Sequence, residues 1–150
     1  MDINFTKEQY LTLIKAIEAG NSVYGIIGDE MRKKYKKQSI DIEDLLTYLL
    51  KFADDFGLKN ITENIEGKLY LKGEFSDAIQ GDVNEYDNSI FWDELIMRLG
   101  KRDFSNTITN EEQEYIDQND GWLPERIQEC YDKWRKEFEK HGLDNLKNHD

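Results

Sequence analysis

The stretch DIEDLLTYLLKFADDF, residues 41–56, carries the clearest structural pattern in the chain. Its apolar residues recur three and four positions apart, at Ile42, Leu45, Leu46, Leu49, Phe52, Ala53 and Phe56. This spacing places them on one face of an α-helix, because a helix completes a turn every 3.6 residues. Gly57 follows at a position where helices commonly end. The stretch therefore predicts an amphipathic helix over 41–56.

Helical patterns also occur on both sides of this stretch. Two capping-box pairs, Thr6 with Gln9 and Thr109 with Glu112, mark helix starts. The other segments with a helical pattern cover about 7–18, 22–37, 75–86, 89–102, 110–118 and 124–141, and internal glycines weaken 22–37 and 75–86. The alternation around Leu69 and Leu71 is compatible with a short β-hairpin at 61–72. We therefore predict a mainly α protein, a single compact helical domain over 1–150 with about six helices.

Composition indicates a folded, strongly acidic protein. Phe, Ile, Leu and Val make up about a quarter of the 150 residues, which is above the level below which disorder is expected. The formal net charge is −12, and such a charge disfavours non-specific binding to nucleic acid. The same charge suits a protein partner with a basic surface. Mimicry of nucleic acid by an acidic protein stays open as a further alternative.

The sequence contains no recognisable catalytic or metal-binding motif. Its two histidines, His141 and His149, lie near the C-terminal end without the Cys–His cluster of a zinc site. Cys130 lies on the apolar stripe of the last predicted helix, which is typical of a buried, inert thiol. We therefore predict a non-enzymatic protein with no catalytic residues, no metal ligands and no cofactor.

The N-terminal residues and the length of the apolar runs indicate the cellular location of the protein. MDINFTKEQY lacks the basic and apolar parts of a signal peptide. The longest apolar runs are a few residues, far shorter than a membrane span. The sequence predicts a cytoplasmic protein that does not engage a membrane.

One basic cluster interrupts the acidic background and is a candidate basic patch. It consists of Arg32, Lys33, Lys34, Lys36 and Lys37. Such a run can contact phosphates, so nucleic-acid contact through Arg32–Lys37 is one alternative. Cations are also favourable at the C-terminal end of a helix, and a solvated helix end is the simpler interpretation.

A second distinctive stretch is EYDNSIFWDELIMRLGKRD, residues 85–103. Placed on a helix, its apolar residues predict burial on more than one side, and Glu94 and Arg98 are spaced for a local ion pair. Trp, Tyr and Arg dominate protein interfaces, so an alternative assigns part of this stretch to a recognition surface. Trp122, after the turn residues Asp120 and Gly121, is the better candidate for an exposed anchor, and packing of its ring on the last helix is the alternative. The candidate interaction surface comprises Trp92, Arg98, Arg102 and Trp122.

The same stretch resembles a group of small acidic bacterial proteins of unknown function. These proteins share a Tyr-Asp…Phe-Trp-Asp-Glu-Leu helix that ends in Arg-Asp, and a closing Gly-Leu-Asp segment. The matching residues here are Tyr86, Asp87, Phe91, Trp92, Asp93, Glu94, Leu95, Arg102, Asp103, Gly142, Leu143 and Asp144. The resemblance implies a bacterial, intracellular protein and brings no activity or site residues with it.

Three hypotheses about function follow from these features. The leading one is a non-enzymatic protein-interaction or regulatory domain, whose protein partner or second copy is unidentified. It predicts an exposed apolar and aromatic patch. The alternative is an enzyme or binder, for a small molecule or metal, with a carboxylate-lined pocket between helices. Nucleic-acid contact or mimicry is the third.

Overall fold

The computed structural model describes residues 4–28 and 33–146. They divide into two compact units, unit 1 up to Tyr86 and unit 2 from Asp87 onward. In the described residues the structure is mainly helical with one two-stranded hairpin, which confirms the predicted fold class. Each unit has its own buried residues, and the single-domain assignment for 1–150 stays a prediction.

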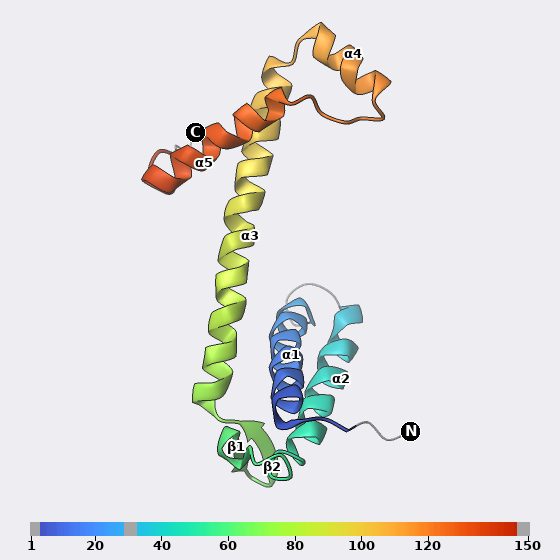
Figure 1. Ribbon diagram of the computed structural model, residues 1–150, viewed down its shortest axis with the longest axis vertical. Helices are drawn as coiled ribbons and strands as arrows, with labels where there is room; N and C mark the ends of the chain where they lie inside the picture. The colour runs from blue at the N-terminus through green and yellow to red at the C-terminus, as the bar shows by residue number, and fades with distance from the viewer. Residues whose placement is uncertain (1–3, 29–32, 147–150) are drawn as a thin grey trace. The chain divides into compact units, whose positions relative to one another are not determined.

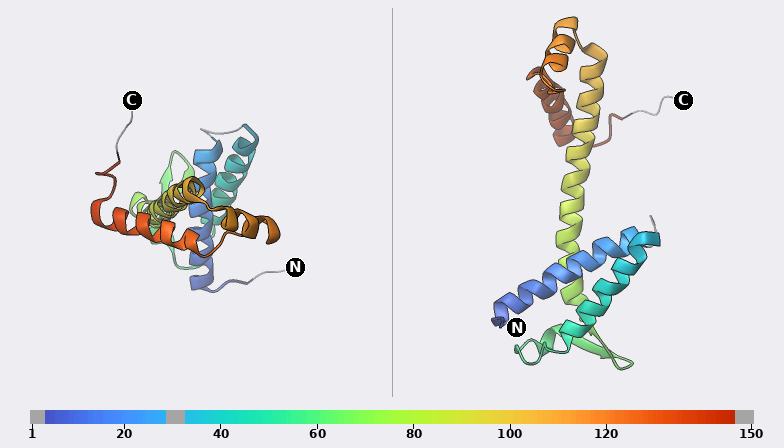
Figure 2. Two further views of the ribbon diagram at one scale, coloured as in Figure 1. Left: turned by 90° about the horizontal axis from the view of Figure 1, so that it is seen from above. Right: turned by 90° about the vertical axis from the view of Figure 1, so that its right-hand side faces the viewer.

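Unit 1 begins with a helical hairpin. Helices α1 (Lys7–Ile26) and α2 (Lys33–Leu50) lie side by side and run in opposite directions (Figures 1 and 2). The short 3-10 helix η2 (Lys59–Ile61) and the strands β1 (Thr62–Ile65) and β2 (Lys68–Leu71) follow, and then the first turns of α3 (Gly73–Thr107).

The start of α1 follows the predicted capping box. Thr6 Oγ1 accepts the backbone N–H of Gln9 at 3.2 Å, and the Gln9 side chain accepts the Thr6 N–H at 2.9 Å. The predicted end near residue 18 is wrong, because α1 continues through Gly20 to Ile26. A glycine inside a helix costs only about 1 kcal/mol relative to alanine, and the contacts between α1 and α2 outweigh that cost. Tyr24 and Tyr35 meet edge to face across the two helices, with ring centroids 6.5 Å apart.

The stretch 41–56 forms a helix over only part of its length. Helix α2 starts earlier, at Lys33, and ends at Leu50, and residues 51–57 form successive turns that close at Gly57 with φ of 65°. The expected helix at 22–37 is likewise divided, since residues 22–26 belong to α1 and residues 33–37 to α2. The register of the tight turns carries Ala53 into the core while Phe52 stays on the surface.

The predicted hairpin is confirmed. Strands β1 and β2 pair antiparallel, with Thr62 opposite Leu71 and Ile65 opposite Lys68. The connecting residues Glu66 and Gly67 both have positive φ, 51° and 88°, as a tight two-residue turn requires. The hairpin packs on α2 and thereby contributes Leu71 to the core of unit 1.

The core of unit 1 joins its two helices to the hairpin. Tyr10 and Ile14 of α1 are almost completely buried, and the Tyr10 hydroxyl donates a 2.6 Å hydrogen bond to the Leu49 carbonyl oxygen. The Phe56 ring stacks on Tyr10 with a centroid distance of 4.2 Å. The buried residues that pack together are Tyr10, Ile14, Leu46, Leu50, Ala53, Leu58, Ile61 and Leu71.

Unit 2 contains the rest of α3, then α4 (Asn110–Gln118) and α5 (Arg126–His141). The two helices expected at 75–86 and 89–102 are one continuous helix, α3, because neither Gly81 nor Ser89 interrupts it. Gly100 allows α5 to approach closely, since a Cβ atom at this position would collide with the Tyr131 ring. The second capping box, Thr109 with Glu112, and the end of α5 at Gly142 agree with the sequence.

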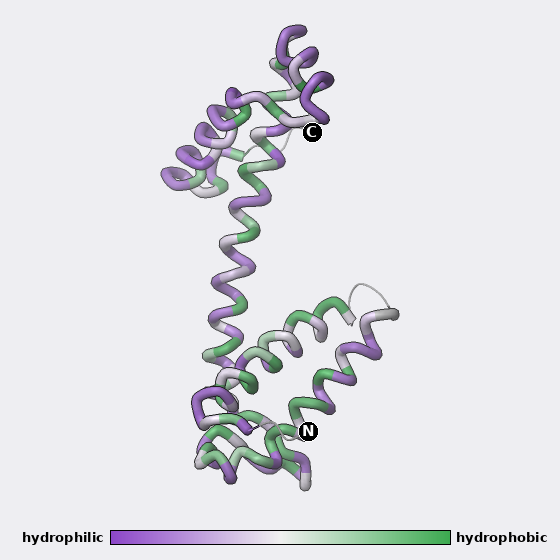
Figure 3. Tube along the Cα trace, turned by 45° about the vertical axis from the view of Figure 1, so that its right-hand side comes forward, coloured by the Kyte–Doolittle hydropathy of each residue, from purple (hydrophilic) through white to green (hydrophobic). Residues whose placement is uncertain are grey.

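Helices α4 and α5 are more hydrophilic than α1, as the colouring in Figure 3 makes visible. Of the helices in the described ranges, none combines the length and apolar character needed to cross a lipid bilayer.

Candidate functional site

The most exposed large apolar side chain among the described residues is Trp122, in the loop between α4 and α5. The side chain is 76% exposed. The backbone before it is fixed by a turn in which Asp120 and Gly121 have φ of 52° and 84°. The Gly121 N–H donates to the Ile116 carbonyl at 3.0 Å, and the Trp122 N–H donates to the Asn119 carbonyl at 2.9 Å. Trp122 is therefore presented to solvent by an ordered, hydrogen-bonded turn.

Apolar neighbours extend the surface around Trp122. Leu123 and Tyr115 are 37% and 47% exposed. A groove of about 450 Å³ runs between the loop, α5 and the end of α3, and its lining includes Trp122, Leu123 and Lys101. A second depression, of about 750 Å³, shares Leu123 and Ile127 with it and reaches Tyr115. We call Tyr115, Trp122 and Leu123, with the groove beside them, the Trp122 surface.

This surface is strongly acidic. Between Glu111 and Glu129 the chain carries seven acidic residues and a single base, Arg126. That base is already engaged, because its guanidinium donates to both carboxylate oxygens of Glu112, Nε to Oε1 at 2.5 Å and Nη2 to Oε2 at 2.8 Å. Lys101 also lines the groove, but the seven acidic residues outnumber these two bases, so the net charge around Trp122 favours a cationic partner.

The Arg126–Glu112 pair also anchors α4 and the loop. Arg126 donates to the Thr107 carbonyl and hydroxyl, both at 3.2 Å, and lies 4.7 Å from the centre of the Phe104 ring. The hydrogen bonds from Arg126, together with the Thr109 backbone N–H, lower the pKa of Glu112 to about 2. The carboxylate is therefore ionised at neutral pH, and the loop that presents Trp122 is tied to the end of α3.

A second polar cluster fixes α5 on α3. The Asp103 carboxylate accepts from Trp134 Nε1 at 2.9 Å, from Lys133 Nζ at 3.3 Å and from Arg102 Nη2 at 2.8 Å. Burial raises the pKa of Asp103, but the hydrogen bonds from Arg102, Trp134 and Lys133 outweigh it, so the pKa lies below its usual value. Arg102 also lies over the Trp134 ring, 5.5 Å from its centre.

The four predicted surface residues occupy different environments. Trp92 is half-buried, between Phe91 and Phe138 at centroid distances of 5.1 and 5.4 Å. Arg98 forms the expected exposed ion pair with Glu94 at 2.9 Å. Arg102 belongs to the Asp103 cluster. Trp122 alone of the four lies on a largely exposed apolar surface, while Tyr115 and Leu123 beside it were not predicted.

The stretch 85–103 is less buried than its composition suggests. Ile90, Phe91 and Met97 are exposed to 42%, 48% and 38%, and Ile96 is the apolar side chain of this stretch that is fully buried. The expected burial on more than one side is therefore wrong. The helix has one side facing α5, and within the described residues of unit 2 Ile90, Phe91 and Met97 stay exposed.

The basic patch is only partly described. Arg32 lies outside the described residues, as do the side chains of Lys33 and Lys34. Lys36 is exposed, and Lys37 forms an exposed ion pair with Asp41.

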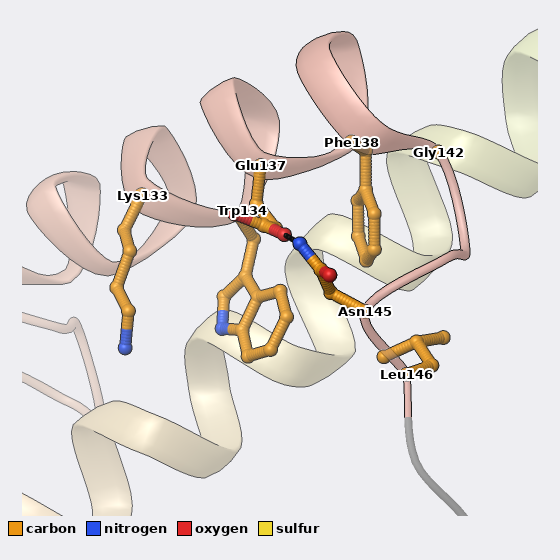
Figure 4. Close-up of a pocket in the computed structure, with 7 residues that line it drawn as sticks. All are labelled: Lys133, Trp134, Glu137, Phe138, Gly142, Asn145 and Leu146. Carbon is orange, nitrogen blue, oxygen red and sulfur yellow. Dashed lines mark hydrogen bonds between the residues drawn. The ribbon is translucent and has the colours of Figure 1, made fainter.

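A further small cavity, of about 170 Å³, lies at the C-terminal end of α5 (Figure 4). Trp134 and Phe138 point into it, and Asn145 reaches back to donate a 2.6 Å hydrogen bond to Glu137. That hydrogen bond and the contact with His141 lower the pKa of Glu137. Since its carboxylate is already engaged, this cavity offers apolar contact rather than acid–base chemistry.

Within the part of the chain that the structure describes, no group of three or more His, Cys, Asp or Glu side chains is arranged to hold a metal ion. Comparison of the chain with protein-family models, with curated proteins and with solved structures finds no match. The arguments about function therefore rest on the chain's own residues.

Proposed function

We propose that this chain is a non-enzymatic protein-interaction domain that docks a basic protein partner on the Trp122 surface. The observation that carries the proposal is the exposure of Trp122 on an ordered turn. Tryptophan is among the residues that contribute most to binding energy at protein interfaces. A largely exposed tryptophan whose backbone is held in place by hydrogen bonds is suited to enter a pocket on a partner with little loss of conformational entropy.

The charge pattern determines the chemistry of the proposed partner. Acidic residues flank Trp122 in the sequence and Asp120 lines the groove beside it, while Arg126 is neutralised by Glu112. A second copy of the chain would bring two acidic surfaces together, so a basic partner is favoured over self-association. The free thiol of Cys130 is compatible with the reducing cytoplasm, where we place the interaction.

Site-specific photocrosslinking in cells that express the full chain tests the proposal. A benzophenone amino acid at position 122 should yield one discrete protein adduct, and the same amino acid at Tyr48, an exposed aromatic position of unit 1, should not. The adduct should diminish in high salt and in Asp120→Lys, because both weaken attraction to a basic partner.

Three results would contradict the proposal. They are the absence of a discrete adduct at position 122, the same adducts at position 48, and an adduct insensitive to salt and to Asp120→Lys. An adduct with twice the mass of the chain would identify self-association instead.

A further inference from the structure

Unit 1 contains a small polar cavity that is separate from the Trp122 surface. The cavity has a volume of about 190 Å³ and lies between α1, α2, β2 and the first turn of α3. Leucines from α2 and β2 form its apolar wall. Its polar lining comes from Glu18, Asn21, Glu43, Thr47, Tyr70 and Ser76, so it contains two carboxylates and no basic side chain.

Glu18 is the unusual residue of this cavity. It is 8% exposed and is the one charged residue that is buried among those described. Its Oε1 accepts a 2.5 Å hydrogen bond from the Ser76 hydroxyl. No buried side-chain oxygen or nitrogen of the described residues lacks a hydrogen-bond partner, so Oε2 stays accessible to water in the cavity. No Lys, Arg or His among the described residues lies within ion-pair distance of it. Oε2 can therefore accept a charge-assisted hydrogen bond from a cation that enters the cavity.

The other carboxylate of the cavity has the partner that Glu18 lacks. Glu43 Oε1 pairs with the ammonium group of Lys68 at 2.6 Å, and the same ammonium lies 5.1 Å from the centre of the Tyr70 ring. The Glu43 side chain is half exposed, which marks the side of the cavity that reaches solvent. The fold thus already binds one ammonium at this cavity, at its outer carboxylate.

We propose that the cavity binds a primary ammonium group carried on a short alkyl chain, with Glu18 as the charged ligand. An ammonium has three hydrogen-bond donors, and three of the lining residues, Glu18, Asn21 and Thr47, carry side-chain oxygens that can accept them. The leucine wall is suited to the alkyl chain.

Two features limit the ligand to this class. The cavity is smaller than the roughly 300–1,000 Å³ typical of sites for drug-sized ligands. A divalent cation is disfavoured, because Ca²⁺ takes six to eight oxygen ligands and the leucines occupy much of the lining. A free alkylamine and a lysine side chain of a peptide share the required chemistry.

Calorimetric titration of the full chain tests the proposal with n-butylammonium as probe. We expect saturable 1:1 binding, and binding of 1-butanol, which has the same shape but no charge, at least about tenfold weaker. Nα-acetyl-lysine methylamide forms the second arm: tighter binding than n-butylammonium identifies a peptide lysine as the source, and weaker binding a free amine. Equal binding of 1-butanol, or no saturable binding of either amine up to about 10 mM, would overturn the proposal.

A matched pair of variants assigns the effect to Glu18. Glu18→Gln keeps an acceptor for the Ser76 hydroxyl but removes the charge, and it should weaken n-butylammonium binding about tenfold or more. Glu63→Gln removes the same charge from an exposed position on β1 of unit 1 and should bind as the wild type does. Far-UV circular dichroism checks that both variants fold. Equal affinity of Glu18→Gln and the wild type for n-butylammonium would exclude the site. If Glu18→Gln does not fold, the comparison of n-butylammonium with 1-butanol on the wild type still tests the proposal.

Discussion

Unit 1 and unit 2 hold their helices together by different interactions. Among the described residues, unit 1 buries ten apolar side chains, whereas unit 2 buries three, Ile96, Phe104 and Phe138. Unit 2 leaves its tryptophans partly or largely in solvent and links its helices through the hydrogen bonds of Asp103 and Arg126. Apolar burial and ion pairing respond differently to truncation and to pH, so the two units should be sensitive to different changes.

The largest expected effect on stability comes from truncating a buried aliphatic side chain in unit 1. Ile14→Ala should lower the free energy of unfolding by about 2–5 kcal/mol, because Ile14 is fully buried and its removal leaves a cavity. Urea unfolding followed by far-UV circular dichroism measures this. Ile26→Ala, at a half-exposed position of the same helix, is the matched control and should change it by about 0.5 kcal/mol or less. Equal losses in the two variants would mean that unit 1 does not depend on this core.

The next effect compares two glycines of the same helix, α3. Gly100→Ala should destabilise unit 2 by about 1–3 kcal/mol, because the new methyl group would overlap the Tyr131 ring of α5. Gly81→Ala, in unit 1, meets no atom within 4 Å and should stabilise the helix by about 0.5–1 kcal/mol. Denaturation followed by both circular dichroism and tryptophan fluorescence separates the units, because all three tryptophans lie in unit 2. A stabilising Gly100→Ala would show that α5 does not pack as described.

Acid should affect unit 2 through Glu112. The folded-state pKa of Glu112 is lowered to about 2 by its hydrogen bonds with Arg126 and the Thr109 backbone. A depressed carboxylate pKa gives stability that is present above the unfolded value of about 4.5 and is lost as pH falls from there toward 2. The thermal midpoint from tryptophan fluorescence should therefore fall over this range in the wild type, and less steeply in Glu112→Gln.

The control for this pH dependence is Glu111→Gln, at an exposed position on the same turn of α4. It should retain the slope of the wild type. The same slope in Glu112→Gln as in the wild type would show that the Arg126–Glu112 pair contributes nothing to the acid response.

The sequence predicted features that depend on neighbouring residues. Both capping boxes, the turn at Glu66 and Gly67, and the Glu94–Arg98 pair involve residues one to four positions apart. The sequence did not predict where a helix ends when the helical spacing of apolar residues continues beyond that point. The apolar spacing of 41–56 continues past Leu50 while the backbone turns, and Ala53 and Leu58, beyond the end of the helix, are buried in the core of unit 1.

The candidate sites were partly predictable for the same reason. The adjacent Asp120-Gly121 turn placed Trp122 in a loop, but the sequence left open whether its ring is exposed or packs on the last helix. Tyr115 could not be placed beside it from sequence, because the bend between α4 and the loop decides which side of α4 is exposed. The burial of Glu18 gave no local signal at all, since its partner Ser76 lies 58 residues further along the chain.

The smallest expected effect on stability belongs to the residue on which the proposed function depends. Trp122→Phe should change the free energy of unfolding by about 0.5 kcal/mol or less, because the side chain is 76% exposed. It should also remove most of the fluorescence that acrylamide quenches readily, whereas Trp92→Phe, at a half-buried ring between Phe91 and Phe138, should leave that fraction intact. A large loss of stability in Trp122→Phe would show that the ring packs within unit 2. A tryptophan that contributes little to stability but is held on a hydrogen-bonded turn is available for a partner. These two properties together distinguish a residue of an interaction surface from a core residue that is only partly covered.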